Sequence, residues 1–416
     1  MRVMVAVSDW TTHWLNVVPL AWALQAAGHE VRLVCPPLQT EPASRAGLVP
    51  VEILQPGELV PKARMHNHVN ARAGHWPYAH LPPDVVTGEP VAALADFDPF
   101  EWIGEHKTRM IESATRSADA AVDFARWWRP NLVLHDLMCV EGPLAARVLG
   151  VPSVLTLWGP VGPDDEVPGV PGLRFLAVDV SRAFQRHDVG EWGPDAIGHV
   201  LDPCPPGLRP SLRADTLPIR QVPYNGPGPW PRWLQEPPAR PRVCVVWGTS
   251  VSTVFGAGSF PVPRLVEALS ELDVEVVFTV TGPDHDRIGH LPERMRAVRN
   301  VPLHLLLPTS DLVVHHGGGG STMTALAAGV PQLVLPPGGD QELIGARIEA
   351  AGIGRTRHNA VADAGWLHAA TAALIGEPGY RSAADRLRQE AADRPTPSAV
   401  VADLVALATV GNSPRP

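Results

Sequence analysis

Residues 311–335 read DLVVHHGGGGSTMTALAAGVPQLVL, and residues 131–157 read NLVLHDLMCVEGPLAARVLGVPSVLTL. Each stretch predicts a short buried strand, a loop, a helix that ends at Gly-Val-Pro and a second buried strand, which together form one βαβ unit. The copies differ after the first strand, because one has Asp136 and the other has two histidines and four glycines. The repetition therefore predicts two similar α/β domains with different chemistry, separated by a cleft.

The beginnings of the two halves support the same division. Residues 1–35 predict a strand, a polar loop, a helix and a strand, and residues 242–280 repeat this order. Strands that alternate with helices predict parallel sheets, whose ligands bind beyond the carboxyl ends of the strands. We expect an N-terminal domain over 1–212, a Pro-rich linker over 213–240, a C-terminal domain over 241–395, and a C-terminal helix and tail over 396–416.

Two further segments lie outside these βαβ units. Residues 62–103 show no clear hydrophobic period, which is typical of a binding loop or lid, or of a partly disordered segment. Residues 398–408, SAVVADLVALA, predict a helix whose apolar face must dock, and the domain junction is one option.

Composition limits the class of protein. The chain has 416 residues, of which 45% are hydrophobic and 19% charged, as in ordinary globular proteins, and its net charge of −9 argues against a nucleic-acid partner. No apolar run is long enough to span a bilayer, and the first residues lack the features of a signal peptide, so we expect a cytoplasmic protein. Free, buried thiols in a reducing compartment are expected for the four scattered cysteines, Cys35, Cys139, Cys204 and Cys244.

The loop after the first strand, residues 8–16, contains His13 and lacks the GxGxxG pattern of a dinucleotide site. Asp136 follows another strand of the same half, so both side chains are expected at one edge of one sheet. A carboxylate bonded to one imidazole nitrogen stabilises the imidazolium that forms when the other nitrogen removes a proton from a ligand. The structural alternatives are that His13 packs between Trp10 and Trp14, or that either residue caps a helix.

The strongest local signal is HHGGGGST, residues 315–322. Four consecutive glycines would weaken a helix or a strand, so the backbone needs positive φ or close approach to another group. At a helix N-terminus that group is most often an anion, and His315 and Ser321 would add directional hydrogen bonds. The absence of a Walker lysine argues against an NTPase. The alternative, a tight turn, would need only one or two glycines.

Two further loops are expected at the same edge. Thr249 and Ser250 follow the first strand of the second half and offer hydroxyls to a phosphate. Asp340 and Gln341 place a carboxylate beside an amide, which suits pairs of sugar hydroxyls, although such a pair is more often a helix cap. The histidines at 66, 68 and 80 are a weak metal pattern without nearby carboxylates, so an acceptor loop or solvent exposure is favoured over a metal site.

Residues 17–34, VVPLAWALQAAGHEVRLV, and residues 307–341, LPTSDLVVHHGGGGSTMTALAAGVPQLVLPPGGDQ, match a known family. Through them the chain resembles the family 1-type GT-B glycosyltransferases of actinobacteria, which attach nucleotide-activated deoxysugars to macrolides, polyketides and other natural products. General similarity covers the chain except residues 60–130 and the linker. The resemblance implies an α/β GT-B fold, in which two Rossmann-like domains face each other across a cleft and a C-terminal helix crosses back to the N-terminal domain.

The resemblance also implies residue roles. His13 matches the general base that deprotonates the acceptor hydroxyl, and Asp136 matches the buried carboxylate that orients it. A nucleoside diphosphate sugar, expected to be a dTDP-sugar, would be bound by Thr249, Ser250, His315, Gly317, Gly319, Gly320, Ser321, Asp340 and Gln341. Neither a metal nor another cofactor is expected, because helix dipole and histidine stabilise the leaving diphosphate. A hydrophobic aglycone is expected over residues 60–105, with Trp10, Trp14, His66 and Trp76 as acceptor-binding residues.

We therefore predict an inverting transfer of a deoxysugar to a hydroxyl of a hydrophobic natural-product aglycone. The rival functions are a nucleotide-sugar epimerase or hydrolase on the same fold, and a non-catalytic accessory protein that binds nucleotide sugars. Two residues depart from the family pattern: Asn16 replaces a usual proline, and Asn300 replaces an aromatic residue that packs on the base in many relatives. Some relatives require a helper protein, so a helper protein and a homodimer both stay open as partners.

Overall fold

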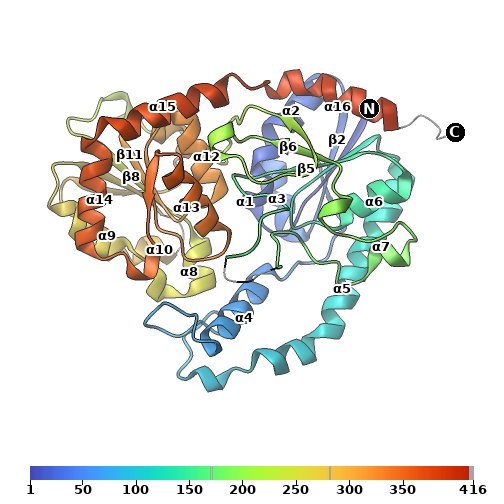
Figure 1. The fold of residues 1–416 in the computed structure, drawn as a ribbon, viewed down its shortest axis with the longest axis horizontal. Coiled ribbons are helices and arrows are strands. Elements are labelled where there is room, and N and C mark those ends of the chain that lie inside the picture. The colour runs from blue at the N-terminus through green and yellow to red at the C-terminus, as the bar shows by residue number, and fades with distance from the viewer. Residues whose placement is uncertain (169, 171, 281–282, 412–416) are drawn as a thin grey trace. The chain divides into compact units, whose positions relative to one another are not determined.

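The computed structural model describes residues 1–168, 170, 172–280 and 283–411, which form two compact units (Figure 1). Unit 1 consists of Met1–Gly57, Gly104–Gly226 and Ala391–Pro416, and unit 2 consists of Glu58–Ile103 and Pro227–Glu390. Each unit contains one parallel sheet flanked by helices. The predicted pair of Rossmann-like α/β domains is therefore confirmed.

The sheet of unit 1 has the order β3-β2-β1-β4-β5-β6-β7. Its central strand β1 pairs in parallel with β2 and β4, so that Val3 lies opposite Val31 and Leu132. Runs of Val and Leu that are buried on both faces are typical of a parallel sheet between helices. The strands are β1 (Arg2–Ala6), β2 (Glu30–Cys35), β3 (Pro50–Glu52), β4 (Leu132–His135), β5 (Ser153–Thr156), β6 (His199–Asp202) and β7 (Asp215–Pro218).

The helices of unit 1 include the predicted C-terminal helix. Helix α16 packs on α2, and its apolar residues Val400 and Leu404 are fully buried in the core beneath the sheet. The chain that leads into α16 is held by Arg394, which forms an ion pair with the buried carboxylate of Asp202. The helices are α1 (Thr11–Trp14), α2 (Val18–Ala26), α3 (Thr40–Arg45), α5 (Pro99–Trp128, whose first turns belong to unit 2), α6 (Glu141–Leu149), α7 (Ala183–Arg186) and α16 (Pro397–Gly411).

The sheet of unit 2 has the order β10-β9-β8-β11-β12-β13, again all parallel. Its strands are β8 (Arg242–Trp247), β9 (Glu275–Val280), β10 (Met295–Val298), β11 (Leu312–His315), β12 (Gln332–Val334) and β13 (Gly354–Thr356). Its helices are α4 (Leu59–Arg72), α8 (Thr249–Phe255), α9 (Val262–Ser270), α10 (Pro283–Asp286), α11 (Leu303–Leu306), α12 (Gly319–Ala328), α13 (Asp340–Ala350), α14 (Ala364–Gly376) and α15 (Pro378–Ala392, which ends in unit 1).

The repeated βαβ units that predicted two domains are present. They are β4-α6-β5 in unit 1 and β11-α12-β12 in unit 2, and both helices end at a left-handed glycine. Gly150 has φ 69° and Gly329 has φ 68°, the conformation that closes a helix without a steric penalty for glycine.

Residues 58–103 belong to unit 2, whereas the sequence placed them in the N-terminal domain without regular structure. They contain the helix α4, which packs on α8. Three side chains of the segment hydrogen-bond the last carbonyls of α8: Arg64 to Thr253 at 2.7 Å, Asn67 to Val254 at 3.0 Å and His80 to Phe255 at 2.8 Å. The packed face of α4 is thus polar, which explains why the sequence shows no apolar period there.

The Pro-rich region also differs from the expected linker over 213–240. Asp215–Pro218 forms β7, the last strand of the unit 1 sheet, and unit 1 extends to Gly226. An edge strand tolerates proline because one side of its backbone needs no ladder partner. At the other end, unit 1 resumes at Ala391 rather than at residue 396.

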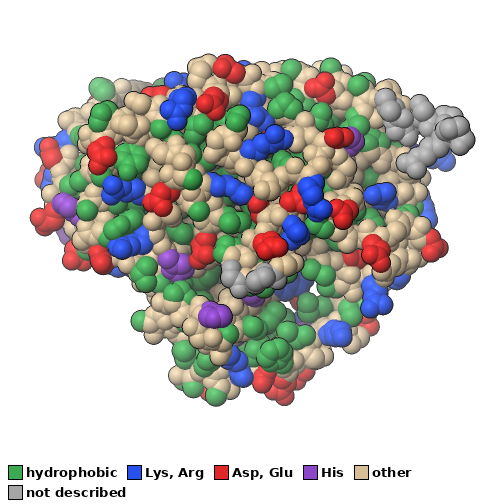
Figure 2. All heavy atoms as spheres, viewed as in Figure 1, with side chains coloured by type: hydrophobic (Ala, Val, Ile, Leu, Met, Phe, Trp, Pro, Cys, Tyr) green, Lys and Arg blue, Asp and Glu red, His purple; other side chains and the backbone are tan. Residues whose placement is uncertain are grey.

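The surface carries charges of both signs, and the thiols are buried. Acidic and basic side chains are interspersed on the face in Figure 2. All four cysteines are buried and free, as predicted. Across the described ranges, no helix has the length and apolar character needed to cross a bilayer. Within the same ranges, no group of three or more His, Cys, Asp or Glu residues could hold a metal ion.

Candidate functional site

In unit 1, the carboxyl ends of three neighbouring strands carry the candidate catalytic residues. Strands β1, β4 and β5 are adjacent in the sheet, so the residues that follow them share one edge. Ser8 and His13 follow β1, Asp136 follows β4, and Trp158 follows β5. The prediction that His13 and Asp136 lie at the same edge is confirmed.

The carboxylate of Asp136 is buried, with 1% of its surface exposed. Its Oδ2 accepts hydrogen bonds from the backbone N–H of Ser8 at 2.8 Å and from the Ser8 hydroxyl at 2.9 Å. Its Oδ1 accepts from the backbone N–H of Met138 at 2.7 Å. Asp136 therefore joins the loop after β1 to the loop after β4.

The imidazole of His13 is connected to Asp136 through Ser8 rather than directly. The Ser8 Oγ lies 3.1 Å from His13 Nδ1. The expected hydrogen bond between the carboxylate and the imidazole is thus replaced by a hydroxyl between them, because Ser8 is bound to the carboxylate by both its backbone and its side chain. One face of the His13 ring is stacked on Trp158, with ring centroids 4.0 Å apart and planes inclined by 12°.

Burial shifts the pKa values of both titratable residues of this group, His13 and Asp136. Desolvation lowers the pKa of the His13 imidazole well below that of an exposed histidine. Desolvation also raises the pKa of Asp136 to about 6, against the opposing effect of its hydrogen bonds from Ser8 and Met138. At neutral pH the imidazole is therefore neutral and able to accept a proton, while the carboxylate is ionised.

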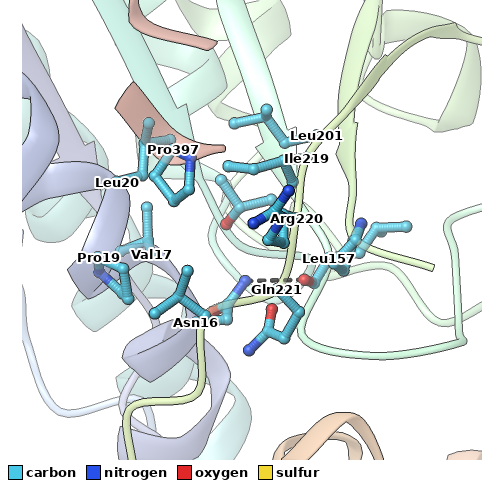
Figure 3. Close-up of a pocket in the computed structure, with 13 residues that line it drawn as sticks. Asn16, Val17, Pro19, Leu20, Leu157, Leu201, Ile219, Arg220, Gln221 and Pro397 are labelled. Carbon is cyan, nitrogen blue, oxygen red and sulfur yellow. Dashed lines mark hydrogen bonds between the residues drawn. The ribbon is translucent and has the colours of Figure 1, made fainter. Parts of the chain in front are cut away.

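Asn16 fixes the end of the loop that carries His13. Its Nδ2 donates a 2.7 Å hydrogen bond to the carbonyl of Leu157, the residue before Trp158 (Figure 3). Asn16 lines a small pocket of unit 1 together with apolar side chains of α2, of β6 and of the chain after β7. Where relatives were expected to have proline, this chain thus uses a side-chain hydrogen bond between the β1 and β5 loops.

Two tryptophans of the loop were predicted to bind the acceptor. Trp14 is 1% exposed, lies in the core of unit 1 and donates from Nε1 to Gln39, so it is a core residue and its predicted role is wrong. Trp10 is half-buried, and its ring lies 6.0 Å from that of His13. Its role in acceptor binding stays a prediction.

In unit 2, a helix begins shortly after the carboxyl end of each of three neighbouring strands. Strands β8, β11 and β12 are adjacent, and they are followed by α8, α12 and α13. Each helix has a glycine as its N-cap, Gly248, Gly318 and Gly339, and none of these ends is capped by a side chain. The first N–H groups of α12 and α13, with the positive ends of the helix dipoles, suit an anion at this edge.

The glycines between β11 and the first turn of α12 are each required for a different structural reason, or face open space. Gly317 has φ 91°, and a Cβ there would lie 3.0 Å from both the Cβ and the carbonyl oxygen of Gln341, so the glycine lets α13 approach the loop. A Cβ on Gly318 would lie 2.8 Å from His316 Nε2. A Cβ on Gly320 would meet nothing within 4 Å, so this glycine faces open space.

His315 was predicted to bind the diphosphate, but in this structure both of its ring nitrogens are engaged within unit 2. Its ring is fully buried, and its Nδ1 accepts a 3.0 Å hydrogen bond from the N–H of Gly317. Nδ1 therefore carries no proton, and Nε2 donates to the Gln332 Oε1 at 2.9 Å. Burial lowers the pKa of His315 to about 3, so the ring stays neutral. His315 holds the loop in shape and has no ring nitrogen left for a ligand.

His316 is the more accessible histidine of the pair. Its ring is half-buried and packs edge-on against Trp247, with centroids 5.7 Å apart. Its Nδ1 has no hydrogen-bond partner among the described residues, and burial lowers the pKa of the ring to about 4.

The other predicted site residues lie in unit 2. Ser250, Gly320, Ser321, Asp340 and Gln341 are half-buried along the loops after β8, β11 and β12, and Gly319 is buried in the first turn of α12. The side chain of Thr249 lies outside the described part of the structure. His66 lies on α4, and Trp76 stacks on Phe255 with a centroid distance of 6.1 Å, so both predicted acceptor residues belong to unit 2.

The sequence analysis did not identify Ser8, Trp158 or His316. Ser8 is the first polar residue after β1, and Trp158 follows the strand next to β4, so the rule that sheet-edge residues converge could have indicated both. His316 could not be distinguished from His315 by sequence, because the end of β11 decides which of the two side chains points into the core.

Replacing Gly317 with alanine is expected to destabilise unit 2 and to weaken the diphosphate binding that the sequence predicts for this loop. A positive φ in a non-glycine residue costs about 1–3 kcal/mol, and the methyl group would also press on the first turn of α13. Chemical denaturation and isothermal titration with dTDP measure the two effects.

Two matched variants separate the causes. Gly352 has φ 70° and no atom within 4 Å of a Cβ, so Gly352→Ala in the same unit isolates the backbone cost, about 1–2 kcal/mol. Gly320→Ala places a methyl in open space on a helix and should leave stability within about 1 kcal/mol of the parent while weakening dTDP binding. Equal stability losses for Gly317→Ala and Gly352→Ala would show that the contact with α13 is unimportant.

The chain matches one protein family over both of its halves. Residues 22–248 match the N-terminal domain, and residues 263–407 the C-terminal domain, of the family described as erythromycin biosynthesis protein CIII-like. Over 440 residues the chain is 35% identical to the TDP-daunosamine transferase DnrS of Streptomyces peucetius, covering 100% of this chain and 98% of that protein.

Solved structures agree with the sequence match. The glycosyltransferase VinC in complex with dTDP superimposes with a TM-score of 0.75 at 29% identity, covering 99% of this chain and 100% of that one. The spinosyn rhamnosyltransferase SpnG complexed with spinosyn aglycone gives a TM-score of 0.75 at 30% identity, covering 97% of this chain and 100% of that one. The two-unit α/β fold is thus the GT-B fold.

Proposed function

Because the chain belongs to the erythromycin biosynthesis protein CIII-like family of glycosyltransferases, we propose that it transfers a deoxysugar from a dTDP-sugar to a hydroxyl of a polyketide-type aglycone. The observation that supports this most is the His13–Ser8–Asp136 group, a neutral imidazole linked to a buried carboxylate at a sheet edge. DnrS is named for a TDP-sugar, and SpnG was solved with an aglycone.

Unit 2 holds the donor in this proposal. The N-termini of α12 and α13 receive the diphosphate, and His316 takes the role first expected of His315, because its ring borders Gly318 and remains partly exposed. Ser321 and Ser250 add hydroxyl donors to phosphate oxygens, and Asp340 and Gln341 bind sugar hydroxyls. Two helix ends and an imidazole stabilise the negative charge of the leaving group, so the reaction does not need a metal ion.

Unit 1 activates the acceptor. Nε2 of His13 takes the proton of the acceptor hydroxyl as the oxygen forms its bond to the anomeric carbon. The bond from that carbon to the diphosphate oxygen breaks, and its electron pair leaves with dTDP. Attack from the side opposite the diphosphate inverts the anomeric configuration. The ionised Asp136 stabilises the positive charge that His13 gains.

The test is an assay of the purified chain with dTDP-deoxysugars and a panel of polyketide aglycones, with and without EDTA. We expect the glycosylated aglycone and dTDP in equal amounts, an inverted anomeric centre by NMR, and no effect of EDTA. Donor turnover without an acceptor would indicate a hydrolase or epimerase. Binding of dTDP without turnover on any aglycone, with or without a helper protein, would contradict the proposal.

A further inference from the structure

The carboxylate of Asp136 has all of its described hydrogen bonds in two short segments. Oδ2 accepts from the N–H and the hydroxyl of Ser8, and Oδ1 accepts from the N–H of Met138. The His13 ring is bonded to Ser8 Oγ instead. Any effect of the carboxylate on the imidazole therefore passes through the hydroxyl of Ser8.

The hydroxyl of Ser8 has a single proton, and the geometry decides where it goes. An ionised carboxylate can only accept, so the short contact with Asp136 at 2.9 Å requires Ser8 to donate its proton there. Toward His13, Ser8 Oγ can then only accept, so the 3.1 Å contact requires a proton on Nδ1. A neutral ring with its proton on Nδ1 has a free electron pair on Nε2.

We infer that Ser8 is a positioning residue that fixes the catalytic tautomer of His13, a role that rests on the proposed function of His13 as general base. Ser8 holds the ring with Nδ1 protonated and Nε2 available for the acceptor proton. When Nε2 takes that proton, the imidazolium donates its Nδ1–H to Ser8 Oγ, whose own O–H still points to the carboxylate. The charge is stabilised through two hydrogen bonds, and Asp136 is not protonated.

The surroundings of Ser8 suit this role. Ser8 is 7% exposed, and its backbone N–H is bonded to the same carboxylate oxygen as its hydroxyl, so the side chain is held in one orientation. Trp158 sets the plane of the imidazole by stacking on its face. The stacking leaves the direction of the ring nitrogens within that plane to be fixed by the contact between Nδ1 and Ser8 Oγ.

The decisive experiment is the tautomer of His13, measured on ¹⁵N-histidine-labelled protein by two-bond ¹H–¹⁵N correlation at neutral pH. The His13 signals are assigned from their loss in His13→Gln. We expect the parent chain to show the form with Nδ1 protonated, and Ser8→Ala to show a mixture that contains the Nε2-protonated form. Ser8→Thr retains the hydroxyl and should restore the parent pattern.

Kinetics supply a second readout. Ser8→Ala should lower kcat by about 10- to 100-fold, the range found when partners that orient metal-binding histidines are removed, and Ser8→Thr should recover most of it. The KM for the dTDP-sugar should not change, because the proposed donor residues lie in unit 2. Ser117→Ala is the matched control: Ser117 is also buried in unit 1, and its hydroxyl accepts from the Gln55 N–H at 2.9 Å. It should alter neither the His13 tautomer nor kcat.

The outcomes separate the two proposals. If Ser8→Ala keeps Nδ1 protonated and retains the parent kcat, Ser8 is not the link, whatever the function of the chain. If the tautomer changes as expected while His13→Gln remains fully active, the positional role of Ser8 stands and the proposed base is wrong. A lower kcat in Ser8→Ala with an unchanged tautomer and no rescue by threonine would also overturn the inference.

Discussion

Replacing His13 with alanine is expected to lower kcat by about 10²- to 10⁴-fold, the contribution of a positioned general base. The variant loses the atom that takes the acceptor proton, whereas the proposed donor-binding residues of unit 2 are untouched. The KM for the dTDP-sugar and the affinity for dTDP should therefore stay close to those of the parent chain. Initial rates of glycoside formation at saturating donor, with isothermal titration of dTDP, provide the measurements.

The matched control for this variant is His187→Ala. His187 also lies in unit 1, and its Nε2 is 3.1 Å from the Asp119 Oδ1, so the same substitution removes a histidine paired with a carboxylate at another place. It should retain the parent kcat. Full activity of His13→Ala would remove His13 from the mechanism, and an equal loss in both variants would point to a general effect on folding.

The architecture could be predicted because its signals are local. Buried runs such as LVLH and LVVH, each followed by a polar loop and a helix ending at glycine, are sufficient to predict parallel βαβ units. The position of His13 and Asp136 at one edge followed from the same rule, since parallel strands present their carboxyl ends together.

The features that could not be predicted from the sequence depend on contacts between segments that are distant in the chain. The end of α8 is capped by side chains of α4, almost 190 residues earlier in the chain, and nothing in either segment alone indicates this pairing. Likewise, whether Asp136 bonds to His13 directly or through Ser8 is decided by the conformation of the loop after β1, which no local sequence pattern indicates. Side-chain direction after a strand, as for His315 and His316, is set by the register of the sheet.

Replacing Asp136 with asparagine tests the carboxylate itself and should lower kcat by up to about 10⁴-fold, as for the equivalent change in Ser-His-Asp enzymes. In either orientation, the NH2 group of asparagine faces a backbone N–H, of Ser8 or of Met138, from which the carboxylate accepts a hydrogen bond. With NH2 toward Ser8, the hydroxyl accepts from it and turns its own proton to His13 Nδ1, so the ring carries its proton on Nε2 and cannot take one from the acceptor. With the amide oxygen toward Ser8, the neutral amide no longer stabilises the positive charge that His13 gains. Steady-state rates measure the loss, and Asp179→Asn, which removes a carboxylate that caps α7 through backbone N–H groups, is the control.

The pH dependence of the same variant identifies the titrating group. Burial raises the pKa of Asp136 from 3.8 to about 6, so kcat/KM of the parent chain should rise with pH through about 6, and the asparagine variant should lack this rise. The His13 pKa is lowered by burial, so the imidazole does not titrate in this range. A rise near pH 6 that persists in Asp136→Asn would assign it to another group.

Stability should show the opposite trend with pH. The folded chain keeps the Asp136 proton up to about pH 6, whereas the unfolded chain releases it near pH 4, so the folded state binds more protons between these values. The parent chain therefore loses about 3 kcal/mol of stability relative to Asp136→Asn as the pH rises from below 4 to above 6, since each pKa unit corresponds to about 1.4 kcal/mol. Urea denaturation of both chains at pH 4.5 and 7.5 should record about 2 kcal/mol of this loss, because the unfolded carboxyl group is already mostly ionised at pH 4.5. A constant difference across the range would mean that the carboxylate is not desolvated, and the charge that assists His13 would then be screened by water.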